Sequence, residues 1–156
     1  MPDNPFHPLV YIGGTPKFGK NVYIGLLSEV TAKGSSVEIG DDCDIASFVS
    51  INVADSHNRT IGLAEEIERK EIVIENNVFI GSHCFIGGGV EIGHHSVVAA
   101  GTIITKPCKI PPYSLIVGNP FVVKAGCYKK AAQKARQKFE SFFQTKSFLL
   151  QPHQKL

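Results

Sequence analysis

The chain has 156 residues but no tryptophan, one methionine and no long hydrophobic run. No segment reaches the roughly 20 consecutive apolar residues of a membrane-spanning helix, so we expect no membrane span. The first ten residues, MPDNPFHPLV, lack the basic and apolar regions of a secretory signal. Together these absences predict a cytoplasmic protein.

Paired cysteines and strong charge are also missing. Cys43, Cys84, Cys108 and Cys127 form no C-x-x-C pair, so we expect free thiols in a reducing compartment. The formal net charge is only +2, which gives no reason to expect a nucleic-acid partner. Apolar residues make up 43% of the chain, a typical share for a single globular unit.

What the chain has instead is a repeat of six residues. An Ile, Val or Phe recurs at this spacing, with a slip of three residues after position 30 and a longer break after position 51. The fifteen positions, called anchors below, are Ile12, Phe18, Ile24, Val30, Ile39, Ile45, Ile51, Ile74, Ile80, Ile86, Ile92, Val98, Ile104, Ile110 and Ile116. Such regularity marks a repeat architecture.

A period of six fits neither an α-helix, at 3.6, nor a simple strand, at 2. It fits a short strand followed by a tight turn, with the anchor pointing inward and often a glycine at the corner after it. Three units make a triangular coil of about eighteen residues, and stacked coils pair in parallel about 4.8 Å apart. The fifteen anchors therefore predict an all-β parallel β-helix of about five coils. Cys43, Cys84 and Cys108 fall at a phase of small residues, so we interpret them as packing residues.

Two interruptions break the repeat. Residues 31–36, TAKGSS, predict a short bulge or irregular turn. Residues 55–71, DSHNRTIGLAEEIERKE, form a longer insertion. Insertions in repeat proteins become surface loops, often on a binding face. We therefore expect this segment to project from a corner and to reach toward a neighbouring subunit.

After the last anchor the chain changes character. Gly118-Asn119-Pro120 predicts a turn, and residues 125–146 have the spacing of a helix with an Ala and Phe face and a basic face. We therefore divide the chain into a β-helix, residues 1–124, and a C-terminal helix and tail, residues 125–156. The helix is expected to cap the open end of the prism, or alternatively to contact a phosphate or an anionic acceptor.

Residues 78–124 read VFIGSHCFIGGGVEIGHHSVVAAGTIITKPCKIPPYSLIVGNPFVVK. This segment resembles the hexapeptide-repeat acetyltransferases, whose pattern runs V-W-I-G, G-V-x-I-G, A-G-S-V-V-T-K, P-P-Y-S and G-N-P. The resemblance implies a left-handed β-helix, acetyl-CoA as donor, and a homotrimer whose sites lie in the grooves between subunits. The ADSHN element at 54–58 is most similar to the subgroup that O-acetylates sugars in capsule, lipopolysaccharide and related glycans.

The resemblance also implies catalytic roles. His57, the one histidine in the 55–71 loop, corresponds to the general base that takes the proton of a sugar hydroxyl. Asp55 is a candidate to orient its imidazole. Ser82 matches the small residue beside the thioester and could stabilise the oxyanion.

Donor and acceptor contacts are implied in the same way. Ala100 matches the position whose backbone binds the pantetheine arm. Thr105 and Lys106 match the T-K pair near the phosphates of CoA, where Lys124 adds charge. Each lysine could equally be an ordinary surface residue.

Acceptor-binding candidates are Phe79, His83 and Asn58. Phe79 stands where the family usually has Trp, which leaves an aromatic wall but no indole donor. Pro107 replaces a common Asp. The chain also lacks the N-terminal helical segment of the galactoside and maltose acetyltransferases, so those specificities are not implied.

Other functions stay open. The acceptor could be the amine of an amino sugar, or an antibiotic hydroxyl as in the xenobiotic acetyltransferases. A substrate ammonium would need a nearby carboxylate, which Glu65, Glu66 and Glu68 offer. A γ-class carbonic anhydrase shares the prism but needs three histidines on a metal. Here His94 and His95 are adjacent, so they cannot point the same way from a strand, and we interpret them as turn residues. We expect no metal site. A non-catalytic scaffold is the remaining alternative.

Overall fold

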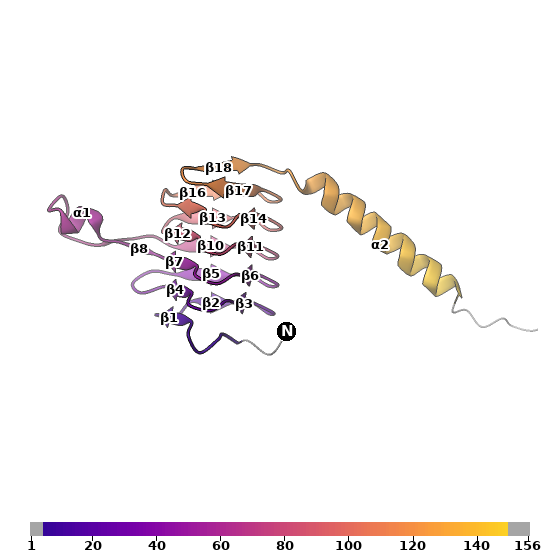
Figure 1. Ribbon diagram of the computed structural model, residues 1–156, viewed down its shortest axis with the longest axis horizontal. Coiled ribbons are helices and arrows are strands. Elements are labelled where there is room, and N and C mark those ends of the chain that lie inside the picture. Colours follow the sequence, from indigo (N-terminus) through magenta and orange to yellow (C-terminus); the bar gives the residue numbers. More distant parts are fainter. Residues whose placement is uncertain (1–4, 150–156) are drawn as a thin grey trace, which may run out of the picture.

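The computed structural model describes residues 5–149, with side chains through residue 143, and most of these residues form a triangular prism of short strands (Figure 1). Each side of the prism is one sheet. Face A contains β1 (Tyr11–Gly13), β4 (Glu29–Thr31), β7 (Ser50–Asn52), β12 (Phe85–Gly87) and β15 (Ile103–Ile104). Face B contains β2 (Lys17–Phe18), β5 (Val37–Ile39), β10 (Ile72–Ile74), β13 (Val90–Ile92) and β16 (Cys108–Ile110). Face C contains β3 (Tyr23–Ile24), β6 (Asp44–Ile45), β11 (Phe79–Ile80), β14 (Val97–Val98), β17 (Leu115–Gly118) and β18 (Phe121–Lys124).

The chain visits faces A, B and C in turn, and each circuit is one coil. Neighbouring strands of a face are parallel and in register, so that Val30 pairs with Ile51 and Ile51 with Ile86. Five strands on face A make five coils. The predicted left-handed parallel β-helix of about five coils is confirmed.

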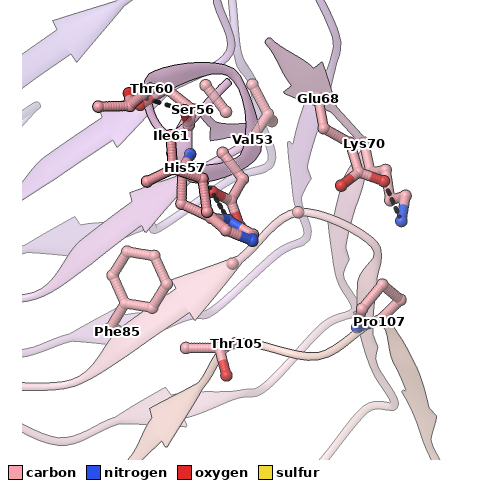
Figure 2. Close-up of a pocket in the computed structure, with 14 residues that line it drawn as sticks. Val53, Ser56, His57, Thr60, Ile61, Glu68, Lys70, Phe85, Thr105 and Pro107 are labelled. Carbon is pink, nitrogen blue, oxygen red and sulfur yellow. Dashed lines mark hydrogen bonds and ion pairs between the residues drawn. The ribbon is translucent and has the colours of Figure 1, made fainter. Parts of the chain in front are cut away.

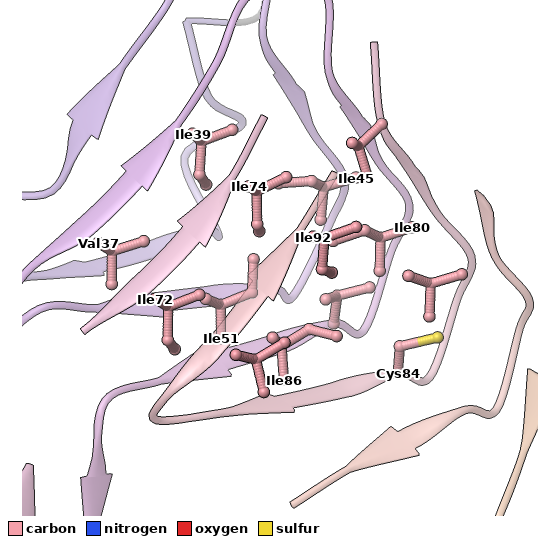
Figure 3. Packing of buried hydrophobic residues seen from close by; sticks show 14 of the residues in the cluster. Val37, Ile39, Ile45, Ile51, Ile72, Ile74, Ile80, Cys84, Ile86 and Ile92 are labelled. Atoms are coloured by element: carbon pink, nitrogen blue, oxygen red, sulfur yellow. The ribbon is translucent and has the colours of Figure 1, made fainter. Parts of the chain in front are cut away.

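The anchors form the core of the prism. Of the fifteen, only Ile12 and Phe18 in the first coil are partly buried, and the other thirteen are buried. Figure 3 shows anchors from the three faces pointing toward one another inside the prism. Full burial of one such side chain stabilises the fold by about 1.5–3 kcal/mol, so the stacked anchors supply its main driving force.

Three corners join the faces, called AB, BC and CA after the faces they connect. A glycine often follows the anchor because the next coil passes close by. A Cβ on Gly81 would lie 2.5 Å from the amide nitrogen of Ala100, which sits one coil further along. The left-handed turn residues are not these glycines, as Asn77 (φ 58°) at the BC corner and His83 (φ 60°) at the CA corner illustrate.

The packing prediction for the cysteines is confirmed at two of three positions. Cys43 and Cys84 are buried, and burial raises the pKa of both thiols. Cys108 is only half-buried, because its strand β16 pairs with β13 on one side alone and lies at the end of face B. Cys127 is exposed.

The insertion projects from the AB corner of the third coil, as expected, and appears at the left of Figure 1. Its stem is a short antiparallel pair, β8 (Ala54–Asp55) with β9 (Glu68–Arg69), and its tip carries the one-turn helix α1 (His57–Thr60). The smaller slip at residues 31–36 is an irregular turn in the second coil, where Gly34 has φ 76°.

The C-terminal helix does not cap the prism, and that expectation was wrong. The last coil is followed by β18, which folds back antiparallel on β17 and covers the final edge of face C. Helix α2 (Lys129–Leu149) then extends away from the prism (Figure 1). Its Phe139 and Phe143 are each 65% exposed. None of the helices in the described part of the chain is long and apolar enough to cross a membrane.

Candidate active site

A pocket opens where the projecting loop meets the AB corner of the third to fifth coils. Figure 2 shows the imidazole of His57 above this pocket, with Phe85, Thr105 and Pro107 around it. Asp55 lines the same pocket. The β8–β9 stem fixes where the loop leaves the prism, so both loop residues are held over the prism wall.

Asp55 and His57 make the tightest polar contact of the loop. The Nδ1 atom of His57 lies 2.5 Å from a carboxylate oxygen of Asp55, which also accepts the backbone N–H of His57 at 3.1 Å. The side-chain hydrogen bond from His57 is the main cause that lowers the pKa of Asp55. An ionised carboxylate only accepts hydrogen bonds, so in a neutral imidazole Nδ1 carries the proton and Nε2 is the acceptor.

Ser82, His83 and Ala100 lie at the CA corner, at the other edge of face A. The carbonyl of Ser82 accepts the N–H of Gly101 at 2.9 Å, which ties two successive coils together. Within residues 5–149 neither the amide N–H nor the carbonyl of Ala100 has a hydrogen-bond partner. This backbone N–H and C=O of an exposed residue can bind an amide of a ligand.

The other residues expected to bind acetyl-CoA lie in two separate places. Thr105 and Lys106 follow β15 at the AB corner, and Thr105 lines the loop pocket. Lys124 ends β18 on face C, opposite Leu115. All three are exposed. The cations that a CoA phosphate would need are therefore accessible, but one chain does not gather them at one point.

One chain thus carries two half-sites. The AB corner holds the loop with Asp55 and His57, and the CA corner holds Ser82 and Ala100. The strands of face A separate the two corners, as β12 separates Ser82 from the pocket at Gly87 and Gly88. A single subunit does not bring the base and the thioester-side residues together.

Two acceptor candidates lie outside both half-sites. Phe79 points outward from β11 in the middle of face C, 41% exposed, beside Asp44 and Val97. Asn58 lies in α1, where its backbone carbonyl accepts the N–H of Leu63 at 2.8 Å. Neither residue lines the loop pocket.

The adjacent histidines lie at the BC corner, which confirms that they are turn residues. The prediction that their side chains point in different directions, as they would from a strand, was wrong. His95 has φ 56°, so the two residues do not alternate as in a strand. Their Nδ1 atoms are 3.0 Å apart, and both rings contact Tyr113. Among the described side chains, no three His, Cys, Asp or Glu residues gather as they would around a metal.

Sequence reasoning missed Phe85 and Phe48. Phe85 lines the loop pocket. It precedes the anchor Ile86, and this phase points outward, which is the signal that could have found it. Phe48 stacks on His83 at the CA corner with ring centroids 4.8 Å apart. The sequence feature that could have identified Phe48 is its position three residues after an anchor, at a corner of the prism. Leu27 and His83 occupy the same position in their own coils.

Comparisons with known proteins agree with this geometry. The family model for the hexapeptide repeat of succinyl-transferase matches residues 18–52 and 71–106, on either side of the projecting loop. The galactoside O-acetyltransferase of Escherichia coli strain K12 is 36% identical over 109 residues, which is 66% of this chain and 53% of that protein. A solved structure of galactoside acetyltransferase with coenzyme A has a TM-score of 0.67 and 34% identity, and the match covers 80% of this chain and 62% of that one.

Another relative transfers a different acyl group. The 2,3,4,5-tetrahydropyridine-2,6-dicarboxylate N-succinyltransferase of Xylella fastidiosa strain 9a5c is 28% identical over 108 residues, which is 61% of this chain and 36% of that protein. The chain thus spans about half the length, or less, of the curated relatives it matches. The repeat, the prism and these matches define a hexapeptide-repeat protein. The chain belongs to the hexapeptide-repeat acetyltransferase family.

Proposed function

We propose that this protein transfers the acetyl group of acetyl-CoA to a hydroxyl of a sugar or glycan, in sites formed between the subunits of a homotrimer. The observation that carries the proposal is the His57–Asp55 contact of 2.5 Å over a pocket. In a neutral imidazole this contact selects the tautomer in which Nε2 is an acceptor, and that acceptor is what a general base for a neutral hydroxyl requires.

The chemistry needs no covalent enzyme intermediate. His57 accepts the hydroxyl proton at Nε2 as the sugar oxygen bonds to the thioester carbon. The Ser82 side of the site stabilises the resulting oxyanion through its hydroxyl or backbone N–H. The carbon–sulfur bond then breaks, and His57 returns the proton to the sulfur of the departing thiol. Asp55 stays ionised and holds the imidazolium in place.

The donor fits the residues of the two corners. The backbone N–H and C=O of Ala100, which have no partner within residues 5–149, can bind the pantetheine arm. Gly101 beside it leaves open space, since a Cβ there would meet no atom within 4 Å. Thr105, Lys106 and Lys124 supply a hydroxyl and two exposed cations for the phosphates.

The trimer follows from the division of the site. If face A of each subunit faces a three-fold axis, its AB corner meets the CA corner of the next subunit. Face B carries the cross-coil ion pairs Lys17–Glu38 (2.6 Å) and Glu91–Lys109 (2.7 Å), which suit a solvent-facing side. Closure of this ring places His57 of one subunit beside Ser82 and Ala100 of its neighbour.

An amine acceptor would call for an unpaired carboxylate in the pocket. Of the loop glutamates, Glu68 lines the pocket, but its carboxylate is bound by Lys70 at 2.6 Å. That ion pair neutralises the charge that would hold an ammonium group. We therefore favour a neutral hydroxyl over an amine as the acceptor.

The test begins with the donor. Calorimetric titration with acetyl-CoA should show micromolar binding at about one site per chain, weakened in Lys106→Ala. A screen of methyl β-D-galactopyranoside, maltose and amino sugars for thiol release should then find a hydroxyl acceptor. His57→Ala should lower kcat by about 10²–10⁴-fold, whereas His95→Ala, at the BC corner, should not. No donor binding at millimolar concentration would refute the proposal.

A further inference from the structure

In the first three coils, the left-handed turn residues of the BC and CA corners differ in chemistry. At the BC corner they include Asn21, Asp42 and Asn77, with φ between 54° and 58°. Asn and Asp tolerate this conformation because their short polar side chains bond locally, and Asn21 indeed donates to Asp42 at 3.0 Å. Further along this corner, His95 (φ 56°) and Tyr113 (φ 60°) adopt the same conformation, and their ring centroids lie 5.0 Å apart.

The CA corner places Leu27, Phe48 and His83 at the same phase, with φ between 57° and 61°. Large side chains are disfavoured in this conformation, and burial does not offset the cost, since Leu27 is 52% and Phe48 is 45% exposed. Strained and exposed residues of this kind point to a contact outside the subunit.

These side chains form a column along the corner. The rings of Phe48 and His83 are stacked at 4.8 Å with an interplanar angle of 27°, and this spacing equals the rise between coils. Ser82 immediately precedes His83, so the aromatic pair ends beside the residue proposed to face the thioester. The column stops at the next coil, where Gly101 (φ 73°) has no side chain.

The end of the column separates the side from which the donor is expected to approach Ser82 from the side left for the acceptor. On the proposed function, the pantetheine arm passes Ala100 and Gly101 and reaches the reaction centre from the fifth-coil side. The acceptor must then approach Ser82 from the opposite side, which is the side of Phe48. Apolar C–H faces of pyranose rings pack well on aromatic side chains such as Phe48.

We propose that Phe48, supported by its stack on His83, is the platform on which the ring of the acceptor sugar packs, and so a specificity-determining residue of the site. The inference rests on the proposed function, because it assumes a sugar acceptor. The position is on the CA corner, so the platform belongs to the subunit whose neighbour supplies His57.

Kinetics with the best sugar of the acceptor screen provide the test. Phe48→Ala should raise the acceptor KM about five- to tenfold, with kcat and the acetyl-CoA Kd nearly unchanged. Phe48→Trp should keep the platform, and Asn77→Ala, at the same phase of the BC corner, should behave as wild type. An unchanged KM in Phe48→Ala overturns the inference alone, whereas a screen that finds no sugar acceptor overturns the proposed function with it.

A second readout separates an acceptor platform from a subunit contact. The chain has no tryptophan, so Phe48→Trp introduces a single fluorophore at the platform. Its emission should change saturably with the sugar, and an Asn77→Trp control should not respond. Light scattering should show the same oligomer for Phe48→Ala and wild type. Dissociation of Phe48→Ala would assign the column to the subunit interface and refute the platform.

Discussion

The Nδ1 atom of His57 and the carboxylate of Asp55 are 2.5 Å apart although both side chains are more than half exposed. Such a contact on an open loop orients a ring more than it stabilises the fold, because exposed ion pairs contribute about 0–1 kcal/mol. On the proposed function, this contact orients Nε2 of His57 toward the acceptor hydroxyl.

Loss of the hydrogen bond between Asp55 and His57 should lower kcat without changing the affinity for acetyl-CoA. We expect Asp55→Asn to lower kcat by about tenfold or more, yet less than the roughly 10²–10⁴-fold loss for His57→Ala, because the base remains but its ring is free to rotate. Acetyl-CoA affinity should not change. Steady-state kinetics with Glu68→Gln, its partner across the β8–β9 stem, as the matched control would check this. Equal losses in both variants would show that the stem, and not the orientation of His57, had been perturbed.

The titration of Asp55 offers a test that needs no substrate. Its pKa is lowered by the hydrogen bond from His57, so the contact favours the folded loop above the ordinary aspartate value of about 3.9 and is lost as pH falls through the lower folded value. A carboxyl NMR titration should give a midpoint below that ordinary value. In His57→Ala the midpoint should move back up. An unshifted midpoint in the wild type would mean that the contact does not form in solution.

The cysteines should differ in reactivity with their burial. Burial raises the thiol pKa of Cys43 and Cys84, so both stay protonated at neutral pH and shielded from reagent. Exposed Cys127 should react first with a thiol reagent, Cys108 more slowly, and the buried pair only on unfolding. Mass spectrometry of timed labelling would identify the sites. Early modification of Cys84 would contradict the packing of the CA corner.

The sequence predicted the fold almost completely, because the six-residue period of the anchors depends only on inward-pointing side chains and local turns. It predicted the loop and the place of His57 for the same reason, since an insertion must leave the period. It did not predict where α2 goes, because the amphipathic pattern of Phe139 and Phe143 indicates a helix but not its partner. It also failed for His94 and His95, whose turn conformation removes the alternation of a strand, and for Phe48, whose contact joins residues 35 positions apart.

Close packing between coils links the fold to the donor site. A Cβ on Gly81 would lie 2.5 Å from the backbone nitrogen of Ala100, so Gly81→Ala must displace the peptide that we propose for the pantetheine arm. We expect a lower Tm and an acetyl-CoA affinity reduced by about tenfold or more, since one hydrogen bond is worth about 1 kcal/mol and backbone strain adds to its loss. Gly13→Ala in the first coil, where the nearest atoms to a Cβ are side-chain atoms of Tyr11 and Thr31 at 3.1 Å, is the control. Wild-type affinity in Gly81→Ala would argue against donor binding at Ala100.

The division of the site between two corners predicts complementation between inactive subunits. His57→Ala removes the base from the AB corner, and Ala100→Trp would block the donor at the CA corner, so each homotrimer alone should be inactive. In mixed trimers, a wild-type loop can meet a wild-type corner of its neighbour. Random exchange of three subunits should then restore about a quarter of the wild-type sites.

Equal amounts of the two variants, unfolded together and refolded, would be assayed for thiol release with the best sugar acceptor. Activity that rises only in the mixture would establish a shared site. If the mixture stays inactive although native mass spectrometry shows mixed trimers, base and donor must be supplied by the same chain.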